Sequence, residues 1–121
     1  VPSLTNSSDL SVFTMLTCLN GYFARPIPDG LSERLLKSTA GGAVSVWSSS
    51  GSTTPDIQEV MARRFFNQLG NGTEVRLGNL INDAKATIVG GRDVRLSWVL
   101  LGDPGLRVRE DAAAKSAKAE F

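Results

Sequence analysis

Residues 10–21 read LSVFTMLTCLNG, and this stretch decides the fold. Its first part, residues 10–18, is mostly apolar and rich in residues that favour strands. It therefore predicts a strand buried on both faces, as in a parallel sheet. The pair Asn20-Gly21 then indicates a turn. The stretch places Cys18 where a buried strand ends and a glycine-containing loop begins, which is where open α/β sheets hold their binding sites.

Helical and strand patterns alternate along the rest of the chain. The predicted elements are helix 31–38, strand 43–47, a polar loop at 48–54, helix 55–69, a helix capped by Thr73 and reaching Ile88, strand 94–101 and strand 106–109. A helical start is also possible for the segment 94–101. This order predicts an α/β fold in which helices cover a sheet. The tail, residues 110–121, has no apolar face, so we expect either a solvated helix or a linker there.

Composition removes several classes of function. The chain has 121 residues and a formal net charge of +1, and no basic stripe is visible, so we expect no nucleic-acid partner. No run approaches the roughly 18 apolar residues that cross a bilayer, so we expect no membrane span. One cysteine and no histidine exclude an intrachain disulfide, an internal Cys–His pair and nearly all zinc sites. We expect neither a metal nor a cofactor, since the Gly-rich phosphate-binding motifs are also absent.

Cys18 has two interpretations on these grounds. Free cysteines are often buried and inert, whereas a thiol at a strand end can meet solvent and act as a nucleophile. Arg25 lies one residue too far from Cys18 for the phosphate-binding loop of tyrosine phosphatases. A thioredoxin motif would need a second cysteine. A buried, inert cysteine and an exposed nucleophile therefore both remain open.

Five segments resemble one family when they are taken in order and spacing. The segment LTCLNGYF, residues 16–23, resembles the nucleophile segment of the gingipain-type cysteine peptidases (peptidase family C25-like), which share the caspase-like fold. The other four segments are LSERLL at 31–36, GAVSVWSSSG at 42–51, LGNLINDAK at 77–85 and WVLLGDPGL at 98–106. The resemblance covers about residues 10–109. It implies that residues 1–109 are the C-terminal part of a caspase-like peptidase domain with a mostly parallel sheet.

The resemblance implies a cysteine endopeptidase with Cys18 as nucleophile and its backbone N–H as an oxyanion donor. The catalytic histidine, followed by a glycine, would come from an upstream segment of the same protein, so we expect this chain alone to be inactive. Gly21 would keep the approach to the sulfur clear. A peptide or protein substrate would lie beside Trp47, Ser48, Ser49 and Ser50, although Trp47 fits the core equally well. The start, Val1-Pro2-Ser3-Leu4, indicates a fragment or a processed subunit.

Two other interpretations remain. A non-catalytic pseudopeptidase on the same fold could use the loop edge to bind proteins or peptides, and an unrelated α/β domain could bury Cys18. A His-Gly pair at an upstream strand end would favour the peptidase. The family's association with secreted bacterial proteins leads us to expect an extracellular or cell-surface location, by analogy alone.

Overall fold

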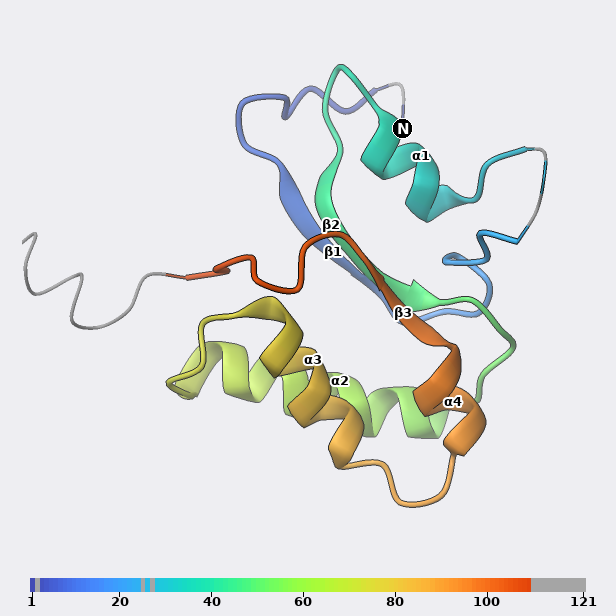
Figure 1. The fold of residues 1–121 in the computed structure, drawn as a ribbon, viewed down its shortest axis with the longest axis vertical. Helices are drawn as coiled ribbons and strands as arrows, with labels where there is room; N and C mark the ends of the chain where they lie inside the picture. Colours follow the sequence, from blue (N-terminus) through green and yellow to red (C-terminus); the bar gives the residue numbers. More distant parts are fainter. Residues whose placement is uncertain (2, 25, 27, 110–121) are drawn as a thin grey trace, which may run out of the picture.

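The computed structural model describes residues 1, 3–24, 26 and 28–109. It contains a mixed sheet of three strands in the order β1-β2-β3, with β1 parallel and β3 antiparallel to the central β2 (Figure 1). The elements along the chain are β1 Ser11–Met15, α1 Leu31–Lys37, β2 Ala43–Ser49, α2 Pro55–Asn71, α3 Leu77–Ala86, α4 Arg92–Ser97 and β3 Trp98–Leu101. The expected α/β fold is confirmed, and one of the two strand pairs is parallel.

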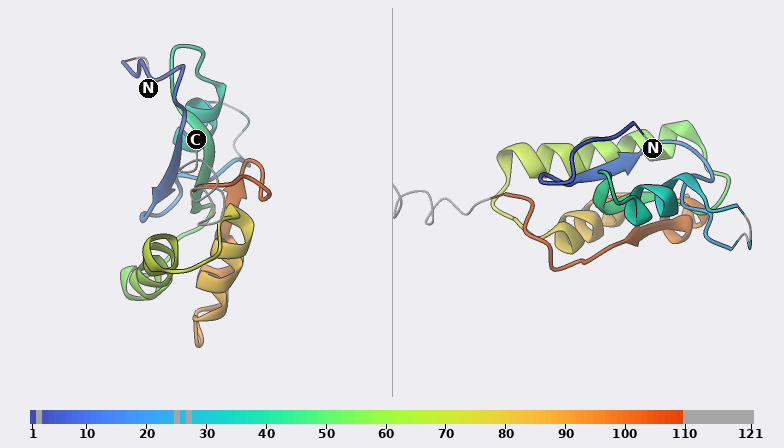
Figure 2. Two further views of the ribbon diagram at one scale, coloured as in Figure 1. Left: turned by 90° about the vertical axis from the view of Figure 1, so that its left-hand side faces the viewer. Right: turned by 90° about the horizontal axis from the view of Figure 1, so that it is seen from above.

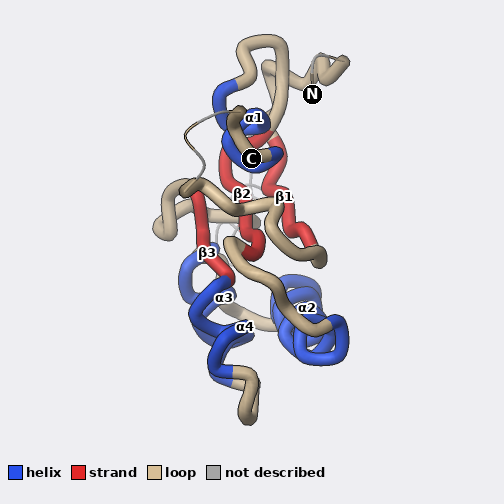
Figure 3. The backbone as a smooth tube through the Cα atoms, turned by 90° about the vertical axis from the view of Figure 1, so that its right-hand side faces the viewer, coloured by secondary structure: helices blue, strands red, loops and turns tan. Residues whose placement is uncertain are grey.

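The helices cover the two faces of the sheet unequally (Figures 2 and 3). Helix α1 lies on one face, where Leu35 packs on Val46 in a small cluster with Ala43. Helices α2, α3 and α4 lie on the opposite face over the main core. The core members are Trp47, Met61, Phe65, Leu77, Leu80, Ile81, Ala84, Ile88, Val94 and Trp98. Strand β2 therefore contributes residues to both hydrophobic clusters.

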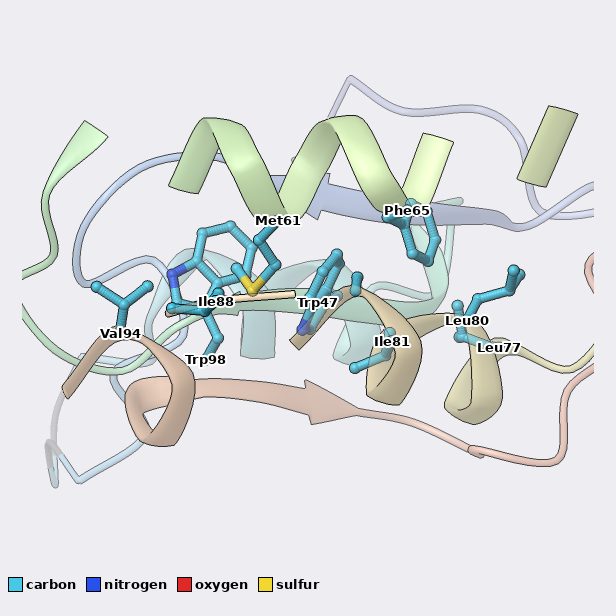
Figure 4. Close-up of a cluster of buried hydrophobic side chains, with 10 residues drawn as sticks. Trp47, Met61, Phe65, Leu77, Leu80, Ile81, Ile88, Val94 and Trp98 are labelled. Atoms are coloured by element: carbon cyan, nitrogen blue, oxygen red, sulfur yellow. The ribbon is translucent and has the colours of Figure 1, made fainter. Parts of the chain in front are cut away.

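Side-chain alternation along β2 explains how its residues divide between the two layers. Trp47 points to the α2–α3 side, with its ring centroid 5.0 Å from Phe65 and 5.0 Å from Trp98 (Figure 4). Val46 points to the α1 side. Ser48 and Ser49 continue the strand and are fully buried. The expected polar loop at 48–54 was therefore wrong for its first two residues, because both hydroxyls find partners inside the protein.

The first strand is shorter and more open than the sequence predicted. It spans Ser11–Met15, with its last four residues half-buried, and Leu16 to Cys18 are exposed. Strand β1 has a partner on one side only within the described residues. An apolar run predicts burial on both faces but does not reveal whether a strand is central or at an edge.

Two other predicted elements differ from the structure. Arg76, rather than Thr73, is the N-cap of α3, and the expected strand 106–109 is a single bridge between Arg76 and Arg107. The segment 94–101 begins as a helix, the alternative left open, because Gly91 caps α4 with a positive φ of 48°. The expected tail at 110–121 lies outside the described residues. In the part of the chain that is described, no helix is long and apolar enough to cross a membrane.

Candidate active site

Cys18 lies in a loop that follows the carboxyl end of β1. The loop, residues 16–22, is called the Cys18 loop here. Cys18 is exposed in this chain, as the nucleophile interpretation expects and the buried interpretation does not. Leu19 adopts a left-handed backbone with φ 62°, a conformation that costs a non-glycine residue roughly 1–2 kcal/mol. Such strain is kept only where surrounding contacts enforce it.

Backbone hydrogen bonds to the end of β2 enforce the conformation of the Cys18 loop. The Leu19 N–H donates to the Gly51 carbonyl at 3.3 Å, and the Gly21 N–H donates to the Ser49 carbonyl at 2.9 Å. Ser50 in turn donates its N–H to the Ser97 carbonyl at 2.8 Å. No group among the described residues accepts a hydrogen bond from the Cys18 N–H. The loop is thus fixed on both sides of Cys18 while the N–H of Cys18 stays available.

A buried pair of serines supports the same loop from the α1 side. The hydroxyl oxygens of Ser32 and Ser48 lie 2.9 Å apart, and the Ser32 hydroxyl donates to the Asn20 carbonyl at 2.7 Å. Both serines are fully buried. Buried hydroxyls are stable only with such partners. Helix α1, strand β2 and the Cys18 loop therefore share one hydrogen-bond network.

Gly21 is required by close packing on β2. A Cβ at this position would lie 2.5 Å from Ser48 Oγ and 3.2 Å from the Ser48 carbonyl oxygen. Gly21 is also buried. The structure thus gives Gly21 a packing role that the sequence did not predict, while the expected clearance over the sulfur stays a prediction.

Gly21→Ala should destabilise the protein, because the added methyl group must displace Ser48 or move the loop. We expect a loss of about 1–3 kcal/mol, seen as a lower thermal unfolding midpoint of the full-length protein. Gly70→Ala in α2 is the matched control, because a Cβ there would meet nothing within 4 Å. Equal unfolding midpoints for the two variants would contradict the packing role.

The Cys18 sulfur has a partner in the segment that follows β2. Its Sγ lies 3.2 Å from the Thr53 carbonyl oxygen, 3.4 Å from the Thr53 backbone nitrogen and 3.8 Å from the Thr53 hydroxyl oxygen. The thiol donates to the carbonyl, whereas a thiolate accepts from the N–H and the hydroxyl. Hydrogen bonds from Thr53, the backbone N–H first, lower the pKa of the Cys18 thiol, and burial opposes them more weakly.

Thr53 and its neighbour Gln58 were missed by sequence reasoning. Thr53 falls in a polar loop, and Gln58 falls on the buried face of α2. The Gln58 side-chain amide donates to the Thr53 hydroxyl oxygen. No sequence pattern signals the contact between Thr53 and Cys18, because the two residues are 35 positions apart.

The four residues predicted to bind substrate differ in how deeply they are buried. Trp47 is fully buried in the core, and Ser48 and Ser49 are fully buried in β2. Ser50 is half-buried, with its hydroxyl donating to the Ser97 carbonyl at 2.8 Å. Strand β2 pairs with strands on both sides, and the Ser50 N–H and the Gly51 carbonyl oxygen also have partners within the protein. Little backbone of this segment is therefore left to pair with a bound peptide. Within the described ranges, no group of three or more metal-binding side chains is present.

Comparison with known proteins gives the family. The model of peptidase family C25 matches residues 1–109. The chain belongs to that family. The match includes the Cys18 loop, β2 and the segment that carries Thr53, so the contacts described above lie within the part that the family shares. A search of the curated proteins found no match.

A solved structure agrees with the family assignment at the level of fold. The chain resembles the crystal structure of the Arg-specific cysteine proteinase gingipain R (RGPB), with a TM-score of 0.72 and 22% sequence identity. The match covers 91% of this chain and 28% of that one. The chain thus spans a little over a quarter of the length of that proteinase. This likeness confirms the gingipain-type fold that the sequence indicated.

Proposed function

We propose that this member of the family is the part of a cysteine endopeptidase that carries the nucleophile, Cys18. The observation that carries the proposal is the exposed thiol held at the end of β1, with hydrogen-bond donors directed at its sulfur. Only the thiolate is a competent nucleophile. Donors to the sulfur favour that form before any substrate binds.

The proposed reaction proceeds by acyl transfer. The thiolate attacks the peptide carbonyl carbon, a C–S bond forms, and the tetrahedral oxyanion accepts a hydrogen bond from the Cys18 N–H. The C–N bond then breaks, and the leaving amine takes a proton from an imidazolium. Water, deprotonated by the imidazole, hydrolyses the thioester and releases the acid and the thiolate. The free N–H of Cys18 supports its part in this scheme.

The imidazole in this scheme comes from an upstream segment of the same protein, because this chain has no histidine. Edge strand β1 supports a place for that segment. Its outer edge is unpaired within the described residues, and an unpaired strand edge is a template for another strand. A strand added there would end beside Cys18 if it ran parallel to β1. The chain alone is therefore proposed to be inactive.

The substrate is proposed to be an extended peptide that lies along residues 50–53. These residues follow the paired part of β2 and lead to the Thr53 contact with Cys18. The Ser50 N–H, the Gly51 carbonyl and both backbone groups of Thr53 already have partners. Ser52 is therefore the residue whose backbone would pair with the peptide. Main-chain pairing of this kind supplies affinity without specifying side chains. Trp47, Ser48 and Ser49 are buried, and their proposed role is to support this segment. An extracellular or cell-surface location in a bacterium is proposed by analogy with the family.

The test is covalent labelling of the full-length protein with peptide electrophiles that differ in the residue before the warhead. Fast, sequence-dependent modification of Cys18, mapped by mass spectrometry, is expected only when the upstream segment is present. Cys18→Ala and the isolated chain serve as controls. Labelling no faster than that of a free thiol, in a folded protein, would overturn the peptidase and favour the non-catalytic binding module.

A further inference from the structure

Gln58 is a buried polar side chain on the face of α2 that is otherwise apolar. It is 4% exposed and shares the buried face of α2 with Met61, Ala62 and Phe65. A buried amide is costly unless it is hydrogen-bonded. Its Nε2 donates to the hydroxyl oxygen of Thr53, the residue that contacts the Cys18 sulfur. A polar side chain on an apolar helix face is therefore connected to the exposed thiol through one residue.

The direction of this hydrogen bond determines where the Thr53 hydroxyl hydrogen can point. A hydroxyl has one hydrogen to donate and two lone pairs. The Gln58 N–H occupies one lone pair, so the hydroxyl hydrogen remains free for another acceptor. The Cys18 sulfur, 3.8 Å from the hydroxyl oxygen, is within reach, and the Thr53 N–H approaches the same sulfur at 3.4 Å. Two donors of one residue thus converge on Cys18 Sγ.

We propose that Gln58 is a positioning residue that fixes the Thr53 hydroxyl as a donor to Cys18 and so favours the thiolate form of the cysteine. The proposal rests on the proposed function and deepens it, because it assigns part of the activation of the nucleophile to this chain rather than to the histidine. Hydrogen bonds from Thr53, with a smaller one from Gln58, lower the pKa of Cys18. No charged side chain among the described residues contributes to that shift.

The experiment measures alkylation of Cys18 by iodoacetamide across pH in the full-length protein, with the modified peptide identified by mass. Thr53→Val keeps the branched shape and removes the hydroxyl, and Gln58→Met keeps the length and removes the donor. Both variants should react about three- to tenfold more slowly at pH 7, because less of the thiol is ionised. The pH midpoints of their alkylation rates should move to higher pH. At high pH their rates should equal or slightly exceed that of the unmodified protein, because a more basic thiolate is the stronger nucleophile.

Two further variants separate positioning from a structural role. Thr53→Ser restores the hydroxyl and should restore the midpoint. Gln68→Met, near the other end of α2, should leave it unchanged. Slower alkylation at every pH with an unmoved midpoint, or no change at all, would overturn the proposal. If Gln58→Met lowers the thermal unfolding midpoint enough to prevent folding, the comparison of Thr53→Val with Thr53→Ser still tests the hydroxyl on which the proposal depends, and equal midpoints for those two variants would overturn it.

Peptide hydrolysis measured on the same proteins keeps this proposal distinct from the peptidase. A shifted alkylation midpoint in a protein that cleaves no peptide would support the role of Gln58 and overturn the proposed function. An unshifted midpoint in a protein that does cleave peptides would support the proposed function and overturn the role of Gln58.

Discussion

Replacing Cys18 by alanine should abolish peptide hydrolysis by the full-length protein, with a fall in kcat of roughly 10⁴-fold or more. The reason is that no other side chain of this chain can form the acyl intermediate at that position. Cys18 is the chain's one cysteine, and the alanine variant has no nucleophilic atom where the sulfur contacts Thr53. The measurement is steady-state cleavage of a peptide with the same residue before the cut as the electrophile that labels the unmodified protein.

Stability provides the control for this result. Cys18 is exposed, so its removal should leave the thermal unfolding midpoint unchanged. Cys18→Ser, which keeps a polar atom near Thr53 but supplies a much weaker nucleophile, should be as inactive as the alanine variant. Residual activity in either variant above about a hundredth of the original would place the nucleophile elsewhere.

Trp47→Ala should cause the largest loss of stability among the substitutions considered. The indole is fully buried against Phe65 and Trp98, so truncation leaves a large cavity between β2 and the helices. We expect a loss of about 3–5 kcal/mol in the free energy of unfolding. The measurement is chemical or thermal unfolding of the full-length protein.

Trp47→Phe separates packing from substrate binding. Phenylalanine retains most of the contact with the two neighbouring rings. It also removes the indole N–H, for which no acceptor is found in the described part of the chain. We expect this variant to lose clearly less stability than the alanine variant. A pocket wall would behave differently: truncation would raise KM and leave the unfolding midpoint nearly unchanged.

The sequence predicted the strand–helix alternation well, and its errors have physical causes. The helix behind Thr54 and Pro55 was predicted correctly because its start carries a local signal. Ser48 and Ser49 were assigned to a loop because their composition is polar. Their burial depends on partners such as Ser32 and Ser97, which lie far away in the sequence. Tertiary hydrogen bonds of this kind leave no local pattern.

The candidate site was predictable only in part for the same reason. A strand followed by Asn-Gly correctly placed Cys18 next to a turn, because both signals are local, but whether the thiol was buried or exposed stayed open. Thr53 and Gln58 could not be found, since one lies in a polar loop and the other on a helix face that is otherwise apolar. Gly21 was singled out, but its close approach to Ser48 became visible only with the sheet assembled.

The hydrogen bonds that fix the Cys18 loop also set the order in which the site can form during synthesis. Cys18 leaves the ribosome before its partners, because its contact with Thr53 spans 35 residues and the contact of Ser50 with Ser97 spans 47. Contacts between such distant residues form late in folding, after the intervening chain is available. The thiol should therefore stay unactivated in the nascent chain and reach its final environment only once β3 has docked. The reactivity of Cys18 would then be delayed until the fold is complete.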